Sequence, residues 1–177
     1  MTSRTVRSPQ QEAARILAQF KTTKPPVPIE KIARGLGAHI RFSPLDDEIS
    51  GMIYIKDGVP IIGVNSLHGP NRQRFTMAHE IGHLILHRDL MSKEVHVDKQ
   101  FQILRRDYNS ASGSERIEIQ ANQFAAELMM PRELLRQAIG PQAIDIDDSA
   151  QLKRLALKFK VSEDAMRYRV TNLFLLR

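Results

Sequence analysis

The sequence predicts an α+β domain in which a small antiparallel sheet near the N-terminus packs on a mainly helical remainder. Runs of β-branched residues with strand character end at Val64, whereas from Asn71 onward apolar residues recur at helical spacing. A chain of 177 residues with 42% apolar residues is also long enough to bury a core. Because the strands precede the helices instead of alternating with them, α+β is favoured over α/β.

Two short helices are expected first. The first begins near Pro9, which the first helical turn tolerates, and its apolar positions recur at helical spacing: Ala13, Ile16, Leu17 and Phe20. The proline-rich residues 24–28 cannot continue this helix. A second helix is predicted over residues 29–36, ended by the segment from Gly35 to Gly37.

The sheet is expected to follow these helices. Residues 49–55 and 59–64 are β-branched runs joined by Lys56-Asp57-Gly58, and an Asp-Gly pair suits a tight hairpin turn. Residues 38–42 are a candidate third strand.

Helices are predicted for most of the remaining chain. Their ranges are 72–90, 115–130, 131–139, 150–159 and 163–175. The polar residues 91–113 between the first two show no clear periodicity, and connections of this length are usually functional or mobile. Residues 140–148 contain Pro141 and three aspartates, so we expect a linker there, between a domain of residues 1–139 and a module of residues 149–177.

Composition excludes several kinds of site. The chain has no cysteine, which rules out disulfides, thiolate metal sites, iron–sulfur clusters and a cysteine nucleophile. Any metal must therefore bind to His, Asp or Glu. No run of 18 apolar residues and no N-terminal signal segment is present, so a soluble, cytoplasmic protein is expected.

The strongest chemical signal is His79-Glu80-Ile81-Gly82-His83, an HExxH sequence. On a helix, His79 and His83 lie on one face and can hold one ion, while Glu80, one step round the helix, reaches a water bound to it. Apolar flanks on several sides predict a buried helix, as a dry metal site requires. The alternative is a pair of histidines that only pack in a core helix.

A third ligand would favour the metal site. His87 lies eight residues from His79, about 12 Å along a helix, so one ion cannot bind both, and His87 is expected at the helix end or on the surface. Glu118 lies beside an apolar stripe and has Asn122 at i+4, so it can complete a His2Glu site while Asn122 orients a ligand imidazole. The alternative for Glu118 is an exposed helix charge.

Two segments together resemble the ImmA/IrrE family of metallopeptidases. They are residues 72–84, RQRFTMAHEIGHL, and residues 118–131, EIQANQFAAELMMP. Residues 29–33 and the hairpin from Ser50 to Asn65 also fit, so the resemblance covers nearly the whole chain. It implies a zincin-like domain with a thermolysin-like site, with zinc on His79, His83 and Glu118 and Glu80 as the catalytic residue.

The resemblance also implies a substrate. Family members are typically encoded with helix-turn-helix repressors, which they cleave to release expression in mobile elements or stress responses. The expected reaction is peptide hydrolysis in which zinc polarises the scissile carbonyl and Glu80 transfers the proton. Candidates to stabilise the oxyanion are Tyr54, His68, His96, Tyr108 or an arginine. Residues 59–64 could align an extended peptide as an edge strand, or form an ordinary hairpin strand.

The C-terminal segment suggests a function of another class. Residues 149–177 hold seven Lys and Arg against two acidic residues, whereas the rest of the chain is nearly neutral. Its two predicted helices, with Ser162 as the N-cap of the second, resemble a helix-turn-helix, and the charge would suit DNA phosphates. A packing module with a solvated basic face is the preferred alternative. The rival function is a non-proteolytic regulator that binds DNA or sequesters a repressor.

Overall fold

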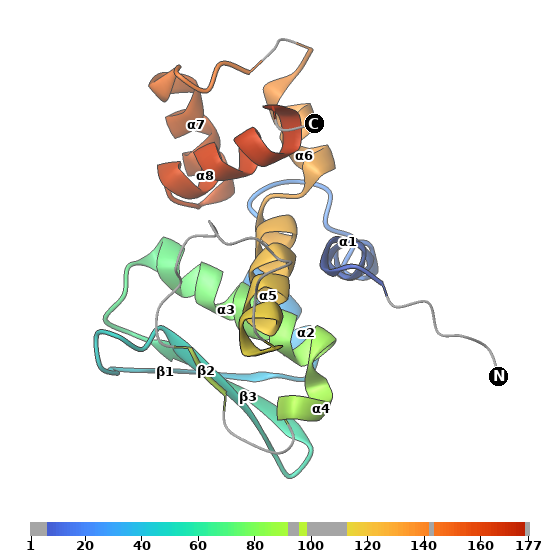
Figure 1. Ribbon diagram of the computed structural model, residues 1–177, viewed down its shortest axis with the longest axis vertical. Coiled ribbons are helices and arrows are strands. Elements are labelled where there is room, and N and C mark those ends of the chain that lie inside the picture. Colours follow the sequence, from blue (N-terminus) through green and yellow to red (C-terminus); the bar gives the residue numbers. More distant parts are fainter. Residues whose placement is uncertain (1–6, 92–95, 99–112, 142–143, 176–177) are drawn as a thin grey trace, which may run out of the picture.

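A four-stranded sheet lies beneath a layer of helices in the computed structural model (Figure 1), which describes residues 7–91, 96–98, 113–141 and 144–175. The strands are β1 (His39–Ser43), β2 (Gly51–Lys56), β3 (Val59–Asn65) and β4 (His96–Asp98). The helices are α1 (Pro9–Gln19), α2 (Ile29–Gly35), α3 (Pro70–Leu86), α4 (Arg88–Met91), α5 (Gly113–Met129), α6 (Arg132–Ile139), α7 (Ser149–Phe159) and α8 (Glu163–Val170), which continues into the π-helical turn η2 (Thr171–Leu175). The predicted α+β class is confirmed.

The sheet is mixed, so the prediction of a purely antiparallel sheet is wrong. Its order is β1-β3-β2-β4, with β2 antiparallel to both β3 and β4, but β1 parallel to β3. The chain reverses between β1 and β2 and again at the hairpin, so β3 runs in the direction of β1. The buried Asn65 side chain holds the first of these connections by donating to the carbonyl oxygens of Leu45, Asp46 and Ile49.

Sheet order also decides the role of β3. Because β1 and β2 flank it, its backbone groups are already paired on both sides, and it cannot accept a further strand. The suggestion that residues 59–64 align a peptide as an edge strand is therefore wrong. Within the described residues, the edges of the sheet are β1 and β4.

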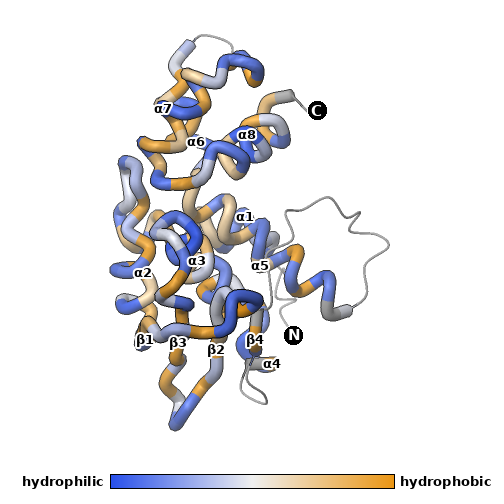
Figure 2. The backbone as a smooth tube through the Cα atoms, turned by 90° about the vertical axis from the view of Figure 1, so that its left-hand side faces the viewer, coloured by the Kyte–Doolittle hydropathy of each residue, from blue (hydrophilic) through white to orange (hydrophobic). Residues whose placement is uncertain are grey.

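Two predicted elements differ in detail from the structure. The helix expected over residues 72–90 is interrupted at His87, which ends α3 before the short α4 begins. The polar residues 91–113 were expected to be a connection, but residues 96–98 form β4. The hairpin of β2 and β3 agrees with its prediction, and Figure 2 shows its hydrophilic tip at the end of the molecule opposite α7 and α8.

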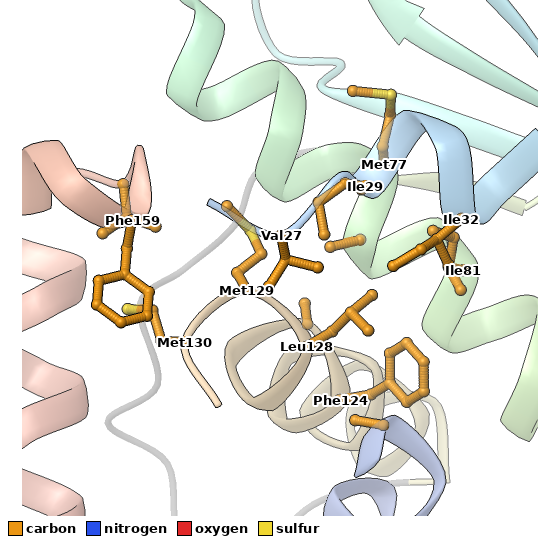
Figure 3. Close-up of a cluster of buried hydrophobic side chains, with 14 of the residues drawn as sticks. Val27, Ile29, Ile32, Met77, Ile81, Phe124, Leu128, Met129, Met130 and Phe159 are labelled. Carbon is orange, nitrogen blue, oxygen red and sulfur yellow. The ribbon is translucent and has the colours of Figure 1, made fainter. Parts of the chain in front are cut away.

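One hydrophobic core runs from the N-terminal helices to the C-terminal pair. Figure 3 shows Ile32, Ile81, Phe124 and Leu128 packed together between α2, α3 and α5. The buried Phe159 at the end of α7 belongs to the same cluster. The core therefore continues past residues 140–148, while the predicted division of the chain there stays a prediction.

Polar contacts also attach the C-terminal helices. Arg169 of α8 is buried, donates from Nε to the Met130 carbonyl oxygen at 3.1 Å and pairs with Glu127 of α5. Arg74 of α3 donates to the carbonyl oxygens of Val27 and Lys160, at 3.0 and 3.4 Å. Two arginines thus connect α3 and α5 with segments distant in sequence.

Among the described helices, none combines the length and apolar character needed to cross a membrane.

Candidate metal centre

The HExxH segment lies in the most enclosed part of α3. Nine consecutive residues, from Thr76 to Leu84, are buried, and the side chains of His79, Glu80 and His83 are fully covered. Helix α3 is enclosed because β2 and β3 pack on one side of it and α5 packs on another. The buried helix predicted from the apolar flanks is therefore present.

The two histidines of the motif face one another. Their Nε2 atoms are 2.9 Å apart, as helical neighbours at i and i+4 can be. The Nδ1 atom of His79 lies 3.0 Å from Asn122 Oδ1 of α5. Since an amide oxygen can only accept, this hydrogen bond assigns the His79 proton to Nδ1 and leaves a lone pair on Nε2.

Helix α5 brings Glu118 to the same point. Its Oε2 is 3.2 Å from His79 Nε2, and its Oε1 is 3.4 Å from His83 Nε2. Gly82 permits this approach, because a Cβ there would lie 3.1 Å from the Cα and carbonyl oxygen of Ala121. The structure thus brings together His79, His83 and Glu118, and it places Asn122 where sequence reasoning expected an orienting partner.

A fourth side chain, His96, comes from β4. Its Nε2 is 3.0 Å from Glu118 Oε1, and its ring centroid is 4.1 Å from that of His83. His96 is the cross-strand partner of Ile53, and residues directly opposite in a sheet share a face. Gly51 lies on that same face of β2, against Thr76 and Glu80 of α3, so His96 also faces α3.

Sequence reasoning named His96 only as one candidate to stabilise an oxyanion, and missed its place among the ligand-type side chains. A signal exists in residues 94–98, Glu-Val-His-Val-Asp, where polar and apolar residues alternate as in a strand. Of the other candidates, Tyr54 lies on the opposite face of β2, and His68 lies in the turn before α3. Tyr108 lies outside the described residues.

These four side chains have the chemistry of a metal site. One nitrogen or carboxylate oxygen from each of His79, His83, His96 and Glu118 lies within 4.8 Å of all the others. Ligand atoms around a tetrahedral zinc are about 3.3 Å apart, since each bond is about 2.0 Å long. The four separations given above, 2.9 to 3.4 Å, are close to this value. A metal cation fits a set of converging lone pairs that would otherwise repel one another.

The protonation states suit a cation as well. Burial lowers the pKa of His83 to about 3, so its ring is neutral near pH 7, which is the form that binds metals. Burial alone would raise the pKa of Glu118, but its close contacts with the imidazoles of His79, His83 and His96 outweigh burial and hold the pKa below its usual 4.5. The carboxyl group is therefore an anion at neutral pH.

Glu80 and His87 lie outside this group of four. The Glu80 side chain faces β2, where Oε1 would lie 3.3 Å from a Cβ placed on Gly51. His87 caps the C-terminal end of α3, and its Nε2 is 2.8 Å from Gln120 Oε1. His87 is at the helix end, as expected, but it is 9% exposed and so not a surface residue.

Comparisons with known proteins identify the family of this chain. The sequence model of the IrrE N-terminal-like domain matches residues 33–171, which is more than half of the chain. A radiation response metalloprotease IrrE from Deinococcus radiodurans is 32% identical over 115 residues, which are 63% of this chain and 31% of the relative. The protein of the same name from Deinococcus deserti is 39% identical over 75 residues, 42% of this chain and 24% of the relative.

A solved structure shares the fold. A transcriptional regulator of Mycobacterium tuberculosis superposes with a TM-score of 0.63 at 18% identity, covering 96% of this chain and 48% of that one. This chain thus spans less than half of each of these relatives. The match of the family over most of the sequence, together with the HExxH helix, shows that the chain belongs to the IrrE N-terminal-like domain family of metallopeptidases.

Proposed function

We propose that this protein is a zinc-dependent endopeptidase. The observation that carries the proposal is the convergence of the buried His79 and His83 with the half-buried Glu118, with Glu80 next to the first ligand. Two imidazoles and one carboxylate are a ligand set of catalytic zinc sites, which keep one further position open. Other divalent metals accept the same ligands, so zinc is part of the proposal.

In this proposal each side chain has a separate task. His79, His83 and Glu118 hold the ion, and Asn122 fixes the tautomer and orientation of His79 through the 3.0 Å hydrogen bond. When bound, zinc polarises the scissile carbonyl and makes water a stronger acid. Glu80 accepts the proton of the attacking water and passes it to the leaving amine, so hydrolysis needs no covalent intermediate with the protein.

The substrate would be an extended peptide held along β4. Among the strands that the structure describes, β4 is an edge of the sheet and carries His96 beside Glu118, whereas β3 is enclosed by its neighbours. An edge strand offers unpaired backbone groups to a further strand. A peptide bound there would lie next to the ligand group, with its scissile bond within reach of Glu80.

A helix-turn-helix repressor encoded near the gene is the proposed substrate, and its cleavage in the cytoplasm would relieve repression in a mobile-element or stress response. The family resemblance supports this substrate, and the names of the Deinococcus relatives, radiation response metalloproteases, are consistent with a stress role. The expected substrate is thus a folded regulator with an exposed segment that can adopt a strand.

The test is incubation of the purified chain with the helix-turn-helix protein encoded beside its gene, followed by intact-mass analysis. We expect two fragments whose formation stops when a chelator removes the metal and resumes when zinc is restored. Cleavage that continues in the chelator would overturn the metallopeptidase assignment. An intact repressor after incubation with the zinc-loaded protein would overturn the proposed substrate.

A second candidate function is a regulator that binds DNA through α7 and α8. The observation that favours it is a row of exposed cations on α7, at Lys153, Arg154 and Lys158. Helix α8, which would read bases, is less suitable because Glu163 and Asp164 occupy its first turn and Arg169 is buried against α5. We therefore favour a packing role for residues 149–177.

A salt titration of DNA binding separates the two roles of α7 and α8. If the exposed cations contact phosphates, the affinity for DNA falls steeply with salt, and replacing Lys153, Arg154 and Lys158 with alanine reduces the slope. We expect weak binding with no difference between the variant and the original chain. A slope that changes with these residues would favour the DNA-binding function.

A further inference from the structure

We propose that His96 is a displaceable fourth ligand that closes the metal site in the resting protein. This inference rests on the proposed function, since it concerns the same ion. The four side chains come from different kinds of element. His79, His83 and Glu118 come from two long helices, whereas His96 comes from a three-residue strand. Its Nε2 nevertheless lies 3.0 Å from Glu118 Oε1, as close as the helical ligands lie to one another.

The number of protein ligands determines whether a zinc site can bind substrate. Structural zinc sites have four protein ligands, whereas catalytic sites have three and leave one position for water or substrate. With His96 in its observed place, a single ion can be surrounded by three nitrogens and one oxygen. A site closed in this way can hold the metal but cannot offer it to a peptide carbonyl.

The four ligands differ in how firmly the fold holds them. The side chains of His79 and His83 are fully buried within α3, and Asn122 further fixes His79. Glu118 lies on α5, which packs tightly on α3 at Gly82. Moving either histidine would therefore disturb the core, whereas Glu118, with a side chain that is 34% exposed, is held in place through the packed helix that carries it.

His96 has much less support. Within the described residues, the strand that carries it, β4, is paired only with β2, over three residues. An isolated pairing of this length is weak, and a small shift of β4 would withdraw the imidazole without opening the core. His96 is thus the ligand that can exchange with an incoming group.

The consequence is regulation at the site itself. A peptide that pairs with the edge of β4 that has no neighbour among the described residues acts on the strand that carries the fourth ligand, so substrate binding and opening of the site become coupled. A small anion that binds metals reports the same opening without a substrate. If the site is open about one-tenth of the time, its apparent affinity for the anion is about tenfold weaker than that of a permanently open site.

The test uses the full chain loaded with cobalt(II), whose visible absorption reports coordination, and azide as the probe. The variants are His96→Ala and His96→Asn, with His39→Ala as the control because His39 is an exposed histidine elsewhere in the sheet. We expect each His96 variant to bind azide at least about tenfold more tightly. We also expect an altered cobalt spectrum and weaker retention of cobalt against a chelator, while His39→Ala matches the original chain.

Equal azide affinity and an unchanged spectrum in the His96 variants would overturn the inference, even if peptide cleavage fell. That result would place His96 next to the substrate and not on the metal. Two variants are used so that a folded one is available, as judged by circular dichroism. Failure of the original chain to bind cobalt would be a different result, because it would overturn the proposed function as well.

Discussion

The two sides of the proposed metal centre are built in very different ways. On one side, α3 and α5 cross closely and provide two histidines and a glutamate from long helices. On the other side, β4, a three-residue strand at the edge of the sheet among the described residues, provides His96. The two helices are held by the core of the domain, whereas in the part of the chain that the structure describes β4 is held by one short strand pairing.

The role of a ligand side chain therefore depends on the element that carries it as well as on its residue type. A ligand on a packed helix is fixed before the metal arrives, which keeps the cost of organising the site low. A ligand on a weak edge can be exchanged. The following predictions test whether the helical side carries most of the metal affinity, in order of decreasing expected loss of that affinity.

Removing Glu118 should have the largest effect on metal binding. Loss of a direct ligand costs more than loss of an outer partner, so we expect Glu118→Ala to weaken zinc affinity by at least about 100-fold. Competition with a chromogenic chelator measures this change, and Glu115→Ala on the same helix is the matched control. If Glu118→Ala binds zinc as tightly as the original chain, the helical side does not hold the ion.

Asn122 should have the next largest effect because it orients His79 without touching the metal. Removal of such an outer partner typically costs about 10- to 100-fold in affinity. We expect Asn122→Ala to lie in this range and Gln123→Ala, its neighbour in sequence, to have no effect in the same competition assay. Equal affinities of the two variants would show that the 3.0 Å hydrogen bond is unimportant for the metal.

The helix crossing at Gly82 is the third test. In Gly82→Ala, the new Cβ would lie 3.1 Å from the backbone of Ala121, and forcing an extra methyl into a packed contact costs about 1–3 kcal/mol. About 1 kcal/mol is regained because alanine favours a helix more than glycine does.

We therefore expect a net decrease of up to about 2 kcal/mol in the free energy of unfolding, measured in urea, with weaker zinc binding because Glu118 moves away from α3. Gly69→Ala is the control, since a Cβ at Gly69 meets nothing within 4 Å. An unchanged zinc affinity in Gly82→Ala would show that zinc binding does not depend on the close crossing of α3 and α5.

The last test involves no bound metal and concerns the pH dependence of the metal-free protein. Burial lowers the pKa of His83 to about 3, whereas an unfolded histidine has a pKa of about 6.5. Below pH 6.5 the unfolded chain binds a proton that the folded chain excludes, so the free energy of unfolding falls as the pH decreases from 6.5 toward 3.

Urea unfolding in the presence of a chelator should show this fall, with a smaller slope between pH 6.5 and 4.5 in His83→Gln. The control is His39→Gln, which should keep the original slope because His39 is exposed. Identical slopes in the His83 variant and the original chain would mean that His83 is not neutral in the folded state.

The same contrast explains what the sequence could predict. The spacing of His79, His83 and Glu118 is visible because each helix repeats its pattern over four or more turns, and the α+β class follows from the same periodicities. The strand that carries His96 has only three residues, and the alternation over residues 94–98 is too short to predict a strand without further support.

The order of the strands in the sheet could not be predicted from the sequence either. The hairpin of β2 and β3 follows from Asp57-Gly58, but the parallel pairing of β1 with β3 depends on contacts between distant segments. No local signal distinguishes a central from an edge strand in this hairpin, which is why residues 59–64 were assigned to the wrong position. Local geometry was therefore predictable, and the arrangement of strands was not.

The central claim is that Glu80 performs proton transfer beside a metal held by other residues, and one comparison tests it most directly. Zinc content and cleavage of the helix-turn-helix protein encoded beside the gene are measured in the original chain and in Glu80→Gln. We predict equal zinc content and a cleavage rate at least about 100-fold lower in the variant, as expected when a general base is lost. Cleavage at the original rate by the zinc-loaded variant would contradict the account.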